Sequence, residues 1–442
     1  MVKLNVYYLC ALFGLSAVII SEGNSDISLD RHGRPTVSSL SRNQIVAGNP
    51  DTKRLVENYN QLTRQLFYGL LKSYPRQTFV LSALAFYNTL AQFSLYSKGQ
   101  TLKAIKDALG TKNTTEMKRI LKIVNKRTFG HDLHLPLRYA TKIYADDKYK
   151  FCSAFKNSFS KYFIGQTGNA DFDNPTKAAR TINAWVNRQE IGQAGNKNLV
   201  NATKIKKDKG FVIVNSFEFE LDFDTGFNPR QVKVINVYSN ERKIINTPAL
   251  VGTGIVKYAY LEKYKAQFIS ITLNGGAFTF FVALPDKVDG LPEMLQKIKR
   301  SNVSEEAFAA QEFRCVNISL PLQRAATQAD LTKILKSVKN LDIVFDKDRA
   351  KFSGVTKKCE AGAIEGVFSE VYLVGKMIED DNLDAMKKSH VAKSICANKD
   401  KITIEINRPY AFSILNNLVG VDTPSLLFSG VYYQNDIVNH NF

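Results

Sequence analysis

Residues 211–223 read FVIVNSFEFELDF, and this run guides the interpretation of the whole chain. Polar and apolar side chains alternate over more than ten residues, and most of the apolar ones are aromatic or β-branched. Because a strand presents successive side chains to opposite faces, the alternation predicts a β-strand.

The chain after this run continues with strand signals. Segments rich in β-branched and aromatic residues, which we expect to be strands, are 257–261, 268–273, 278–283, 315–320, 401–406, 412–415 and 425–431. Two short helices are expected among them, at 292–299, where Pro292 stands at the first position, and at 329–336.

The chain before this run is mainly helical. Apolar residues recur every three to four positions between residues 55 and 70, which predicts a helix that begins near Asp51 and stops at Pro75. Further helices are expected at 101–109, 115–127, 151–163 and 178–188, with a largely apolar stretch at 79–96 and a strand at 140–144. Helices that precede strands, without strict alternation, indicate an α+β fold with large antiparallel sheets.

Composition limits the class of protein. The 442 residues are 44% hydrophobic and 23% charged, which excludes collagen-like, mucin-like and wholly disordered chains. The formal net charge of +19 favours anionic partners such as glycosaminoglycans, nucleic acid or acidic protein surfaces.

The N-terminus predicts secretion. Lys3 precedes an apolar run at 6–20, and Ser21 and Gly23 place small residues where a signal peptidase cuts. This run is shorter than the ~20 residues of a membrane-spanning helix, and no later charge-free stretch is longer, so we expect no membrane span. We therefore assign residues 1–23 to a signal peptide, 24–50 to a flexible leader and 51–442 to a single domain.

Sequons and cysteines fit an extracellular chain. Four N-x-S/T sequons are candidate glycosylation sites: Asn113, Asn201, Asn302 and Asn317, of which Asn317 lies in an apolar run and is expected to be unused. Four cysteines follow the signal peptide, and they permit two disulfides in three connectivities or buried free thiols: Cys152, Cys315, Cys359 and Cys396. Without a Cys-x-x-Cys or a His/Cys cluster, we expect no metal site.

Signatures of catalysis are absent from the sequence. It has no Gly-x-Ser-x-Gly elbow, no His-Glu-x-x-His and no phosphate-binding Gly-x-x-x-x-Gly-Lys-Ser/Thr loop. We therefore expect no enzyme activity and no cofactor. A secreted enzyme with a dispersed site stays as a rival hypothesis.

Six segments, in order, resemble the serpin family over roughly residues 55–436. They are 97–101 (SKGQT), 182–186 (INAWV), 214–219 (VNSFEF), 352–355 (FSGV), 407–412 (NRPYAF) and 427–430 (LFSG). The resemblance implies three mostly antiparallel β-sheets, about nine helices and an exposed reactive loop, at about 381–400 here. In inhibitory members a serine protease cleaves this loop, which then inserts as a new strand into the main sheet and traps the protease.

The hinge that begins the loop departs from the family pattern. Inhibitory members have a glycine and then small Thr/Ala-rich residues, whereas this chain has Leu383, Asp384, Ala385, Met386, Lys387 and Lys388. Since neighbouring residues of a strand face opposite sides, one of the two lysines points inward in either register. Burying an unpartnered lysine is costly, so we expect impaired insertion, although a lysine that snorkels would permit slow insertion.

Other family positions also differ. Phe223 stands where the family has tryptophan, and residues 82–85 read SALA instead of Ser-Pro-x-Ser. We align residues 373–375 (LVG) with the family's His-Lys-Ala, so that Ser82 and Asn215 are kept while their partners become Ala85 and Leu373.

Counting from the hinge places the scissile bond near Asn398–Lys399, within two or three residues. The lysines nearby suit a trypsin-like protease, but they equally suit a solvated loop. Cys396 lies in the same loop, where Cys359 and another chain are both possible partners.

A helix at 115–127 carries a cationic stripe. Its basic residues, which resemble the glycosaminoglycan-binding helix of heparin-dependent serpins, are Lys118, Arg119, Lys122, Lys126 and Arg127. A second basic cluster is Lys204, Lys206, Lys207 and Lys209. A solvated face explains such runs equally well, and nothing in the sequence indicates nucleic-acid recognition.

Two interpretations follow from the resemblance. The first is a secreted, monomeric serpin of the serine-endopeptidase-inhibitor class that has lost efficient trapping and acts by binding, as a decoy, a carrier or a partner of sulfated polysaccharide. The second is an active suicide inhibitor of an extracellular trypsin-like serine protease.

Overall fold

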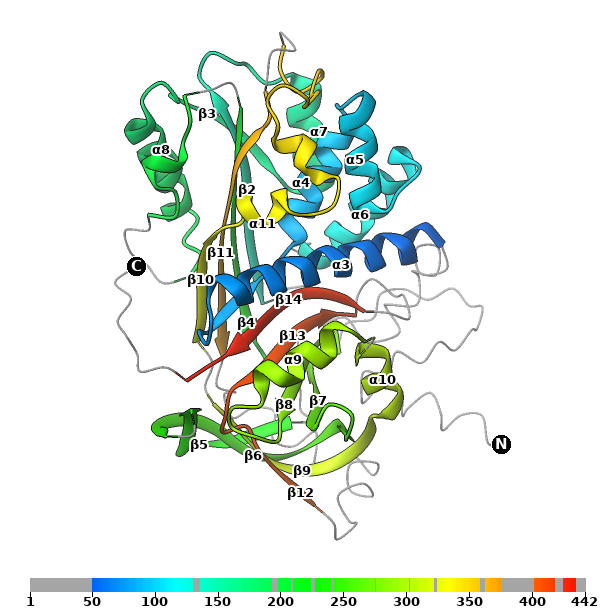
Figure 1. Cartoon of the computed structure of the whole chain (residues 1–442), viewed down its shortest axis with the longest axis vertical. Coiled ribbons are helices and arrows are strands. Elements are labelled where there is room, and N and C mark those ends of the chain that lie inside the picture. The colour runs from blue at the N-terminus through cyan, green and yellow to red at the C-terminus, as the bar shows by residue number, and fades with distance from the viewer. Residues whose placement is uncertain are drawn as a thin grey trace, which may run out of the picture.

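The structure, a computed structural model, describes residues 50–434 except 130–135, 193–197, 208–209, 224–226, 241, 275, 302, 322–323, 358–361, 376–400 and 418–423. These residues form nine α-helices and fourteen β-strands, so the expected α+β fold is confirmed (Figure 1). In Figure 1 the long helix α3 crosses the middle of the molecule, with long strands above it and a second group of strands below.

Most helices lie where the sequence predicts them. Their bounds are α3 Pro50–Ser73, α4 Leu84–Ser94, α5 Gly99–Leu109, α6 Thr114–Phe129, α7 Ser153–Phe163, α8 Pro175–Asn187, α9 Leu291–Lys299, α10 Val303–Ala310 and α11 Thr332–Lys336. Gly110 ends α5 at φ 67°, a left-handed conformation that favours glycine. The helix expected at 329–336 begins only at Thr332, because Ala329 and Asp330 belong to a strand.

A five-stranded sheet has the strand order β10-β11-β4-β2-β3. The strands are β2 Leu137–Asp146, β3 Gln166–Ala170, β4 Phe211–Leu221, β10 Arg324–Asp330 and β11 Ile364–Gly375. The strand predicted at 211–223 is confirmed as β4, and ten of its 11 residues are buried while the other is half-buried. The polar positions Asn215, Ser216 and Glu218 are buried among them, because the strand lies at the centre of a sheet that is covered on both faces.

A nine-stranded sheet contains the remaining strands. They are β1 Phe79–Leu81, β5 Phe227–Asn240, β6 Lys243–Leu261, β7 Ala266–Leu273, β8 Phe278–Pro285, β9 Glu312–Pro321, β12 Ile402–Glu405, β13 Tyr410–Asn416 and β14 Ser425–Tyr432. The 19-residue β6 pairs with β5 over residues 243–254, with β9 over 249–258 and with β7 over 257–261. By hydrogen bonding the described residues therefore form two sheets instead of three, because β6 joins two of them.

The main core lies between the two sheets. Phe217 and Phe219 of β4 pack their rings 5.8 and 5.6 Å from that of Phe428 on β14. α3 also contacts β14, where the Tyr59 hydroxyl donates to the Leu426 carbonyl at 2.7 Å. Among the described helices, none is long and apolar enough to cross a bilayer.

Candidate functional site

The candidate site is the seam between β4 and β11. The two strands run parallel and pair from Ile364 opposite Phe211 to Gly375 opposite Leu221, with one register shift between Ile364 and Gly366. They are hydrogen-bonded to each other along this length, so no further strand lies between them. The hinge and scissile-bond residues lie outside the described residues: Leu383, Asp384, Ala385, Met386, Lys387, Lys388, Asn398 and Lys399.

One face of the seam is apolar where β11 ends. The side chains there belong to the main core and are at most 2% exposed: Phe217, Phe219, Leu221, Val371 and Leu373. A strand that entered beside the end of β11 would place every second side chain against this surface.

The opposite face holds a buried carboxylate. Glu370 of β11 is fully buried, and Ser216 of β4 donates a hydrogen bond to it across the seam. The Glu370 carboxylate also accepts from Tyr372 at 3.3 Å and from Gln328 of β10 at 3.5 Å. Burial and, secondarily, this carboxylate raise the pKa of Tyr372, so its hydroxyl stays protonated and can donate.

A second carboxylate on this face binds the connection that follows α8. Glu218 accepts from Arg138 of β2 and from the backbone N–H of Gly192. A side chain at Gly192 would collide with the Tyr372 ring, so the glycine permits the connection to approach the sheet closely. Opening the seam would therefore disturb bonds to Glu370 and, through Tyr372, this packing.

The structure corrects one alignment in the seam. Ser369, and not Leu373, lies opposite Asn215, whereas Leu373 lies opposite Phe219. Asn215 instead accepts from the Thr141 hydroxyl at 2.6 Å. The Ser369 hydroxyl is buried without a hydrogen-bond partner in the part of the chain that the structure describes.

A cationic cluster joins α6 to α7. The ammonium groups of Lys118, Lys122 and Lys161 lie 5.0, 5.6 and 5.6 Å from the ring centre of Tyr162. Lys161 and Tyr162 of α7 were not predicted to belong to this site, because only the packing of α7 against α6 brings them there. We call Lys118, Lys122, Lys161 and Tyr162 the Tyr162 cluster.

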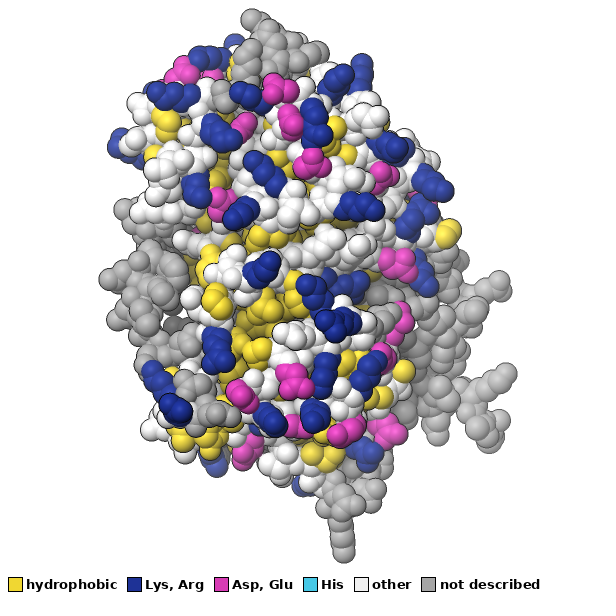
Figure 2. All heavy atoms as spheres, viewed as in Figure 1, with side chains coloured by type: hydrophobic (Ala, Val, Ile, Leu, Met, Phe, Trp, Pro, Cys, Tyr) yellow, Lys and Arg dark blue, Asp and Glu magenta, His cyan; other side chains and the backbone are white. Residues whose placement is uncertain are grey.

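The other predicted basic residues differ in their surroundings. Arg119 binds Glu116 of the same helix, while the side chains of Lys126 and Arg127 lie outside the described part. In the second basic cluster, Lys204 pairs with Asp330 at 3.3 Å and Lys206 pairs with Glu365 at 3.1 Å. Lys207 is exposed, and Lys209 lies outside the described residues. Figure 2 shows basic side chains over the whole visible face, so the net charge is not confined to one patch.

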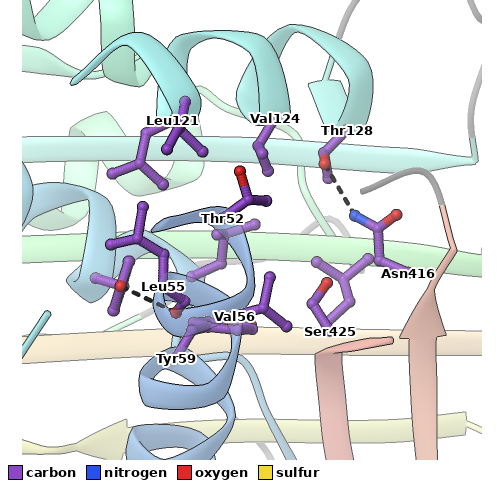
Figure 3. A pocket seen from close by; sticks show the side chains of 13 residues that line it. Thr52, Leu55, Val56, Tyr59, Leu121, Val124, Thr128, Asn416 and Ser425 are labelled. Carbon is purple, nitrogen blue, oxygen red and sulfur yellow. Dashed lines mark hydrogen bonds between the residues drawn. The ribbon is translucent and has the colours of Figure 1, made fainter. Parts of the chain in front are cut away.

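An apolar cavity of about 30 Å³ lies beside α6, between α3 and the ends of β13 and β14 (Figure 3). Asn416 of β13 donates to Thr128 of α6 at 2.9 Å at its edge. Thr52 of α3 is fully buried here, and its hydroxyl has no hydrogen-bond partner among the described residues. The volume is about that of one water molecule, which would need two or more polar partners to be held.

The sequons occupy different settings. Asn113 accepts from the backbone N–H groups of Thr115 and Glu116 and so caps α6, and Asn201 accepts from that of Thr203. Asn317 is exposed on β9, so the apolar run does not bury it, and Asn302 lies outside the described residues.

The cysteines also differ from one another. Cys152 is free and half-buried, whereas Cys315 on β9 is disulfide-bonded. Cys359 and Cys396 lie outside the described residues. No group of three or more candidate metal ligands occurs where side chains are described.

Residues 57–434 match a family model described as Serpin (serine protease inhibitor). The chain belongs to the serpin family. The match covers most of the chain, so the serpin resemblance of the sequence is confirmed.

Curated relatives agree with the assignment. Alaserpin of Manduca sexta is 27% identical over 331 residues, which cover 74% of this chain and 83% of alaserpin. Antitrypsin of Bombyx mori is 26% identical over 384 residues, covering 84% and 92% of the two chains.

Solved structures confirm the serpin fold. Native protease nexin-1 with heparin aligns with a TM-score of 0.72 at 20% identity, over 88% of this chain and all of that one. Serpin48 of the insect Tenebrio molitor has the same TM-score and coverage at 19% identity. The protein is thus a serpin of the serine-protease-inhibitor class by family.

Proposed function

We propose that this serpin is secreted, that its protease trap is impaired or lost, and that it acts by binding, as a protease decoy, a carrier or a partner of a polyanion. The signal-like N-terminus supports secretion, with residues 1–23 removed, 24–50 a leader and 51–442 one domain. We propose a monomer.

The apolar face of the seam carries this proposal. The inserting strand would begin beside the end of β11, next to Phe217, Phe219 and Leu373. Because Lys387 and Lys388 are adjacent, one of them would face these side chains in either register. Among the described residues of β4 and β11, none that faces this side of the seam's end carries a carboxylate, so the lysine must lose its proton or its hydration at a cost of several kcal/mol.

The opposite face of the seam should tolerate a lysine of the inserting strand better. Glu218 and Glu220 lie on it, so the second lysine meets carboxylates there. The defect therefore depends on a single inward lysine, and substitution of both lysines removes it in either register.

The test is protease trapping. We expect the purified protein, incubated with a panel of extracellular trypsin-like serine proteases, to be cleaved near Asn398 and to release active protease without an SDS-stable complex. The double variant Lys387→Ala/Lys388→Ala should form more of this complex. The matched control, Lys333→Ala/Lys339→Ala, removes two exposed charges elsewhere and should change nothing.

A stable complex with the unchanged chain would contradict the proposal. It would establish the alternative, an active suicide inhibitor of a trypsin-like protease. Hydrolytic turnover of a substrate, abolished by substitution of a pocket serine or histidine, would instead support an enzyme.

The Tyr162 cluster supports a polyanion as partner. Three ammonium groups around one ring form a compact cationic surface, and Lys122 and Lys161 are exposed. Protease nexin-1, which has the same fold, was solved with heparin. We propose that sulfated polysaccharide binds across α6 and α7, with an affinity that falls as salt rises.

A further inference from the structure

A charged cleft of about 390 Å³ lies where α11, the 3₁₀ helix η4 (Leu341–Phe345) and the first residues of β11 contact one another. Eight residues line it, of which seven are charged and Phe345 is the exception. The volume is within the range of about 300–1,000 Å³ that is typical of small-molecule sites. The charged lining favours a ligand that forms many hydrogen bonds over an apolar one.

Glu365 of β11 forms the buried part of this cleft. The pairing of β11 with β4 advances from Ile364 to Gly366 on one strand and by a single residue on the other, so Glu365 is the extra residue of a bulge. A bulge changes the direction in which its side chain points. Gly210 leaves room for this side chain, because a Cβ there would lie 2.2 Å from the Glu365 Cγ. The local backbone therefore directs a carboxylate, whose side chain is only 5% exposed, towards the cleft.

The Glu365 carboxylate has acceptor capacity that the chain does not use. The Lys206 ammonium, 3.1 Å from one of its oxygens, is the only partner that the described residues give it. An ionised carboxylate has two oxygens with about four lone-pair sites, and a buried one is costly unless hydrogen bonds fill them. The cleft thus offers acceptor sites to a ligand that carries hydroxyl groups.

Lys336, the last residue of α11, supplies a positive charge to the same cleft. Its exposed ammonium lies 5.8 Å from the ring centre of Phe345, and no described carboxylate binds it. The two aspartates of the cleft already have a cation, since Arg349 donates to Asp346 at 2.7 Å and to Asp342. Lys336 is therefore available to an anionic group of a ligand.

We infer that this cleft binds a short acidic saccharide, whose ring hydroxyls donate to Glu365 and whose carboxylate binds Lys336. A simple anion would leave the acceptor sites of Glu365 unfilled. A cationic ligand would compete with Lys206 for the same carboxylate and would be repelled by Lys336. The site shares no residue with the Tyr162 cluster and does not depend on the proposed function.

The position of the cleft gives binding a physical consequence. Lys206 belongs to the connection that leads into β4, whereas Glu365 belongs to β11, so the site joins the two sides of the seam at its far end. A ligand that binds only the folded chain stabilises it, and a saturating saccharide should therefore raise the thermal midpoint.

Titration calorimetry with the full secreted chain tests the class of ligand. The probe is a disaccharide of glucuronic acid and N-acetylglucosamine, and the comparators are sodium acetate and the neutral disaccharide of N-acetylglucosamine. We expect one saturable site for the acidic disaccharide and affinities at least about tenfold weaker for both comparators. Equal binding of acetate would reduce the cleft to an anion site, and equal binding of the neutral sugar would remove the role of Lys336. Either result, or no binding of the probe, overturns the inference.

Substitutions place the probe in the cleft. Lys336→Gln should weaken binding about tenfold, and Glu365→Ala should abolish it. The matched control, Lys333→Gln, removes an exposed charge from the same helix but does not line the cleft, and should change nothing. Because Lys336 is exposed, Lys336→Gln remains informative if Glu365→Ala does not fold. An unchanged affinity in Lys336→Gln, or an equal loss in Lys333→Gln, would refute the site.

The Tyr162 cluster provides the last comparison. Lys118→Gln/Lys122→Gln should lose affinity for heparin and keep its affinity for the acidic disaccharide. Loss of the disaccharide in this variant would show that the probe binds at the Tyr162 cluster, which overturns the cleft and leaves the polyanion proposal intact. Unchanged heparin affinity together with disaccharide binding would contradict the polyanion proposal and leave the cleft.

Discussion

Ser369 and Asn215 face each other at the centre of the seam, but they do not bond to each other. Asn215 uses Thr141 instead, and the Ser369 hydroxyl is buried without a partner among the described residues. A buried hydroxyl that has given up its water without gaining a partner destabilises the fold. The seam is thus held by Ser216 and Glu370 on one face, while its other face contributes packing.

We predict that Ser369→Ala raises the free energy of unfolding by about 1 kcal/mol, because it removes the desolvated hydroxyl and leaves the packing intact. The measurement is a denaturant unfolding curve. Thr52→Val, which removes the unpartnered hydroxyl at the α3 cavity, should give a similar gain. Ser216→Ala should lower the stability by about 1.5–3 kcal/mol, since it takes a donor from a buried carboxylate. Destabilisation by Ser369→Ala would show that this hydroxyl has a partner.

One prediction from the sequence was wrong at the level of a single residue, namely the β11 residue that lies opposite Asn215. Asn215 was recognised from its motif, but its neighbour on β11 was placed four residues too far along the chain. The register of a strand pair depends on long-range contacts, and the LVG run of residues 373–375 offered a false match. The structure identifies Ser369 by its position opposite Asn215.

At the scale of elements, α6 was predicted nearly to its ends, because a basic helix with one apolar face has a clear period. The Tyr162 cluster was not predicted, since its lysines come from two helices whose packing the period does not encode. Conversely, the second basic cluster looked equivalent in sequence, yet two of its lysines pair with Asp330 and Glu365.

We predict that Lys118→Gln/Lys122→Gln weakens heparin binding about tenfold or more, taking about 1 kcal/mol for each lysine at an anionic surface. Salt-gradient elution from immobilised heparin measures this change. Lys204→Gln/Lys206→Gln should weaken binding less, because both cations already have carboxylate partners. Lys333→Gln/Lys339→Gln controls for net charge. Equal losses in all three variants would indicate that the distributed charge of +19, and not the Tyr162 cluster, binds the polyanion.

At the scale of the whole molecule, the motifs predicted the serpin fold and the order of helices and strands predicted the α+β class, but β11 was missed. Its sequence, IEGVFSEVYLVG, has no period of two, and its continuous apolar run covers only residues 371–374. It is nevertheless buried on both faces over most of its length, with Glu370 accommodated by Ser216, Gln328 and Tyr372. A strand that buries a carboxylate against partners from two other strands cannot be recognised from its own residues.

Impaired insertion could come from the seam between β4 and β11 or from the sequence of the reactive loop, and a peptide that is not part of the chain separates these two causes. If the seam is competent, a separate peptide of 11 residues, the length of β4, can add as a strand between β4 and β11. We predict that a Thr/Ala-rich peptide raises the thermal midpoint, because a ligand bound only to the folded state stabilises it. A peptide with this chain's own residues 381–391 should not raise the thermal midpoint, because it would bring Lys387 or Lys388 against Phe217 and Phe219. The same peptide with both lysines changed to alanine should recover the effect. A rise with the unchanged peptide would show that the lysines are tolerated, and a failure of all three would place the defect in the seam.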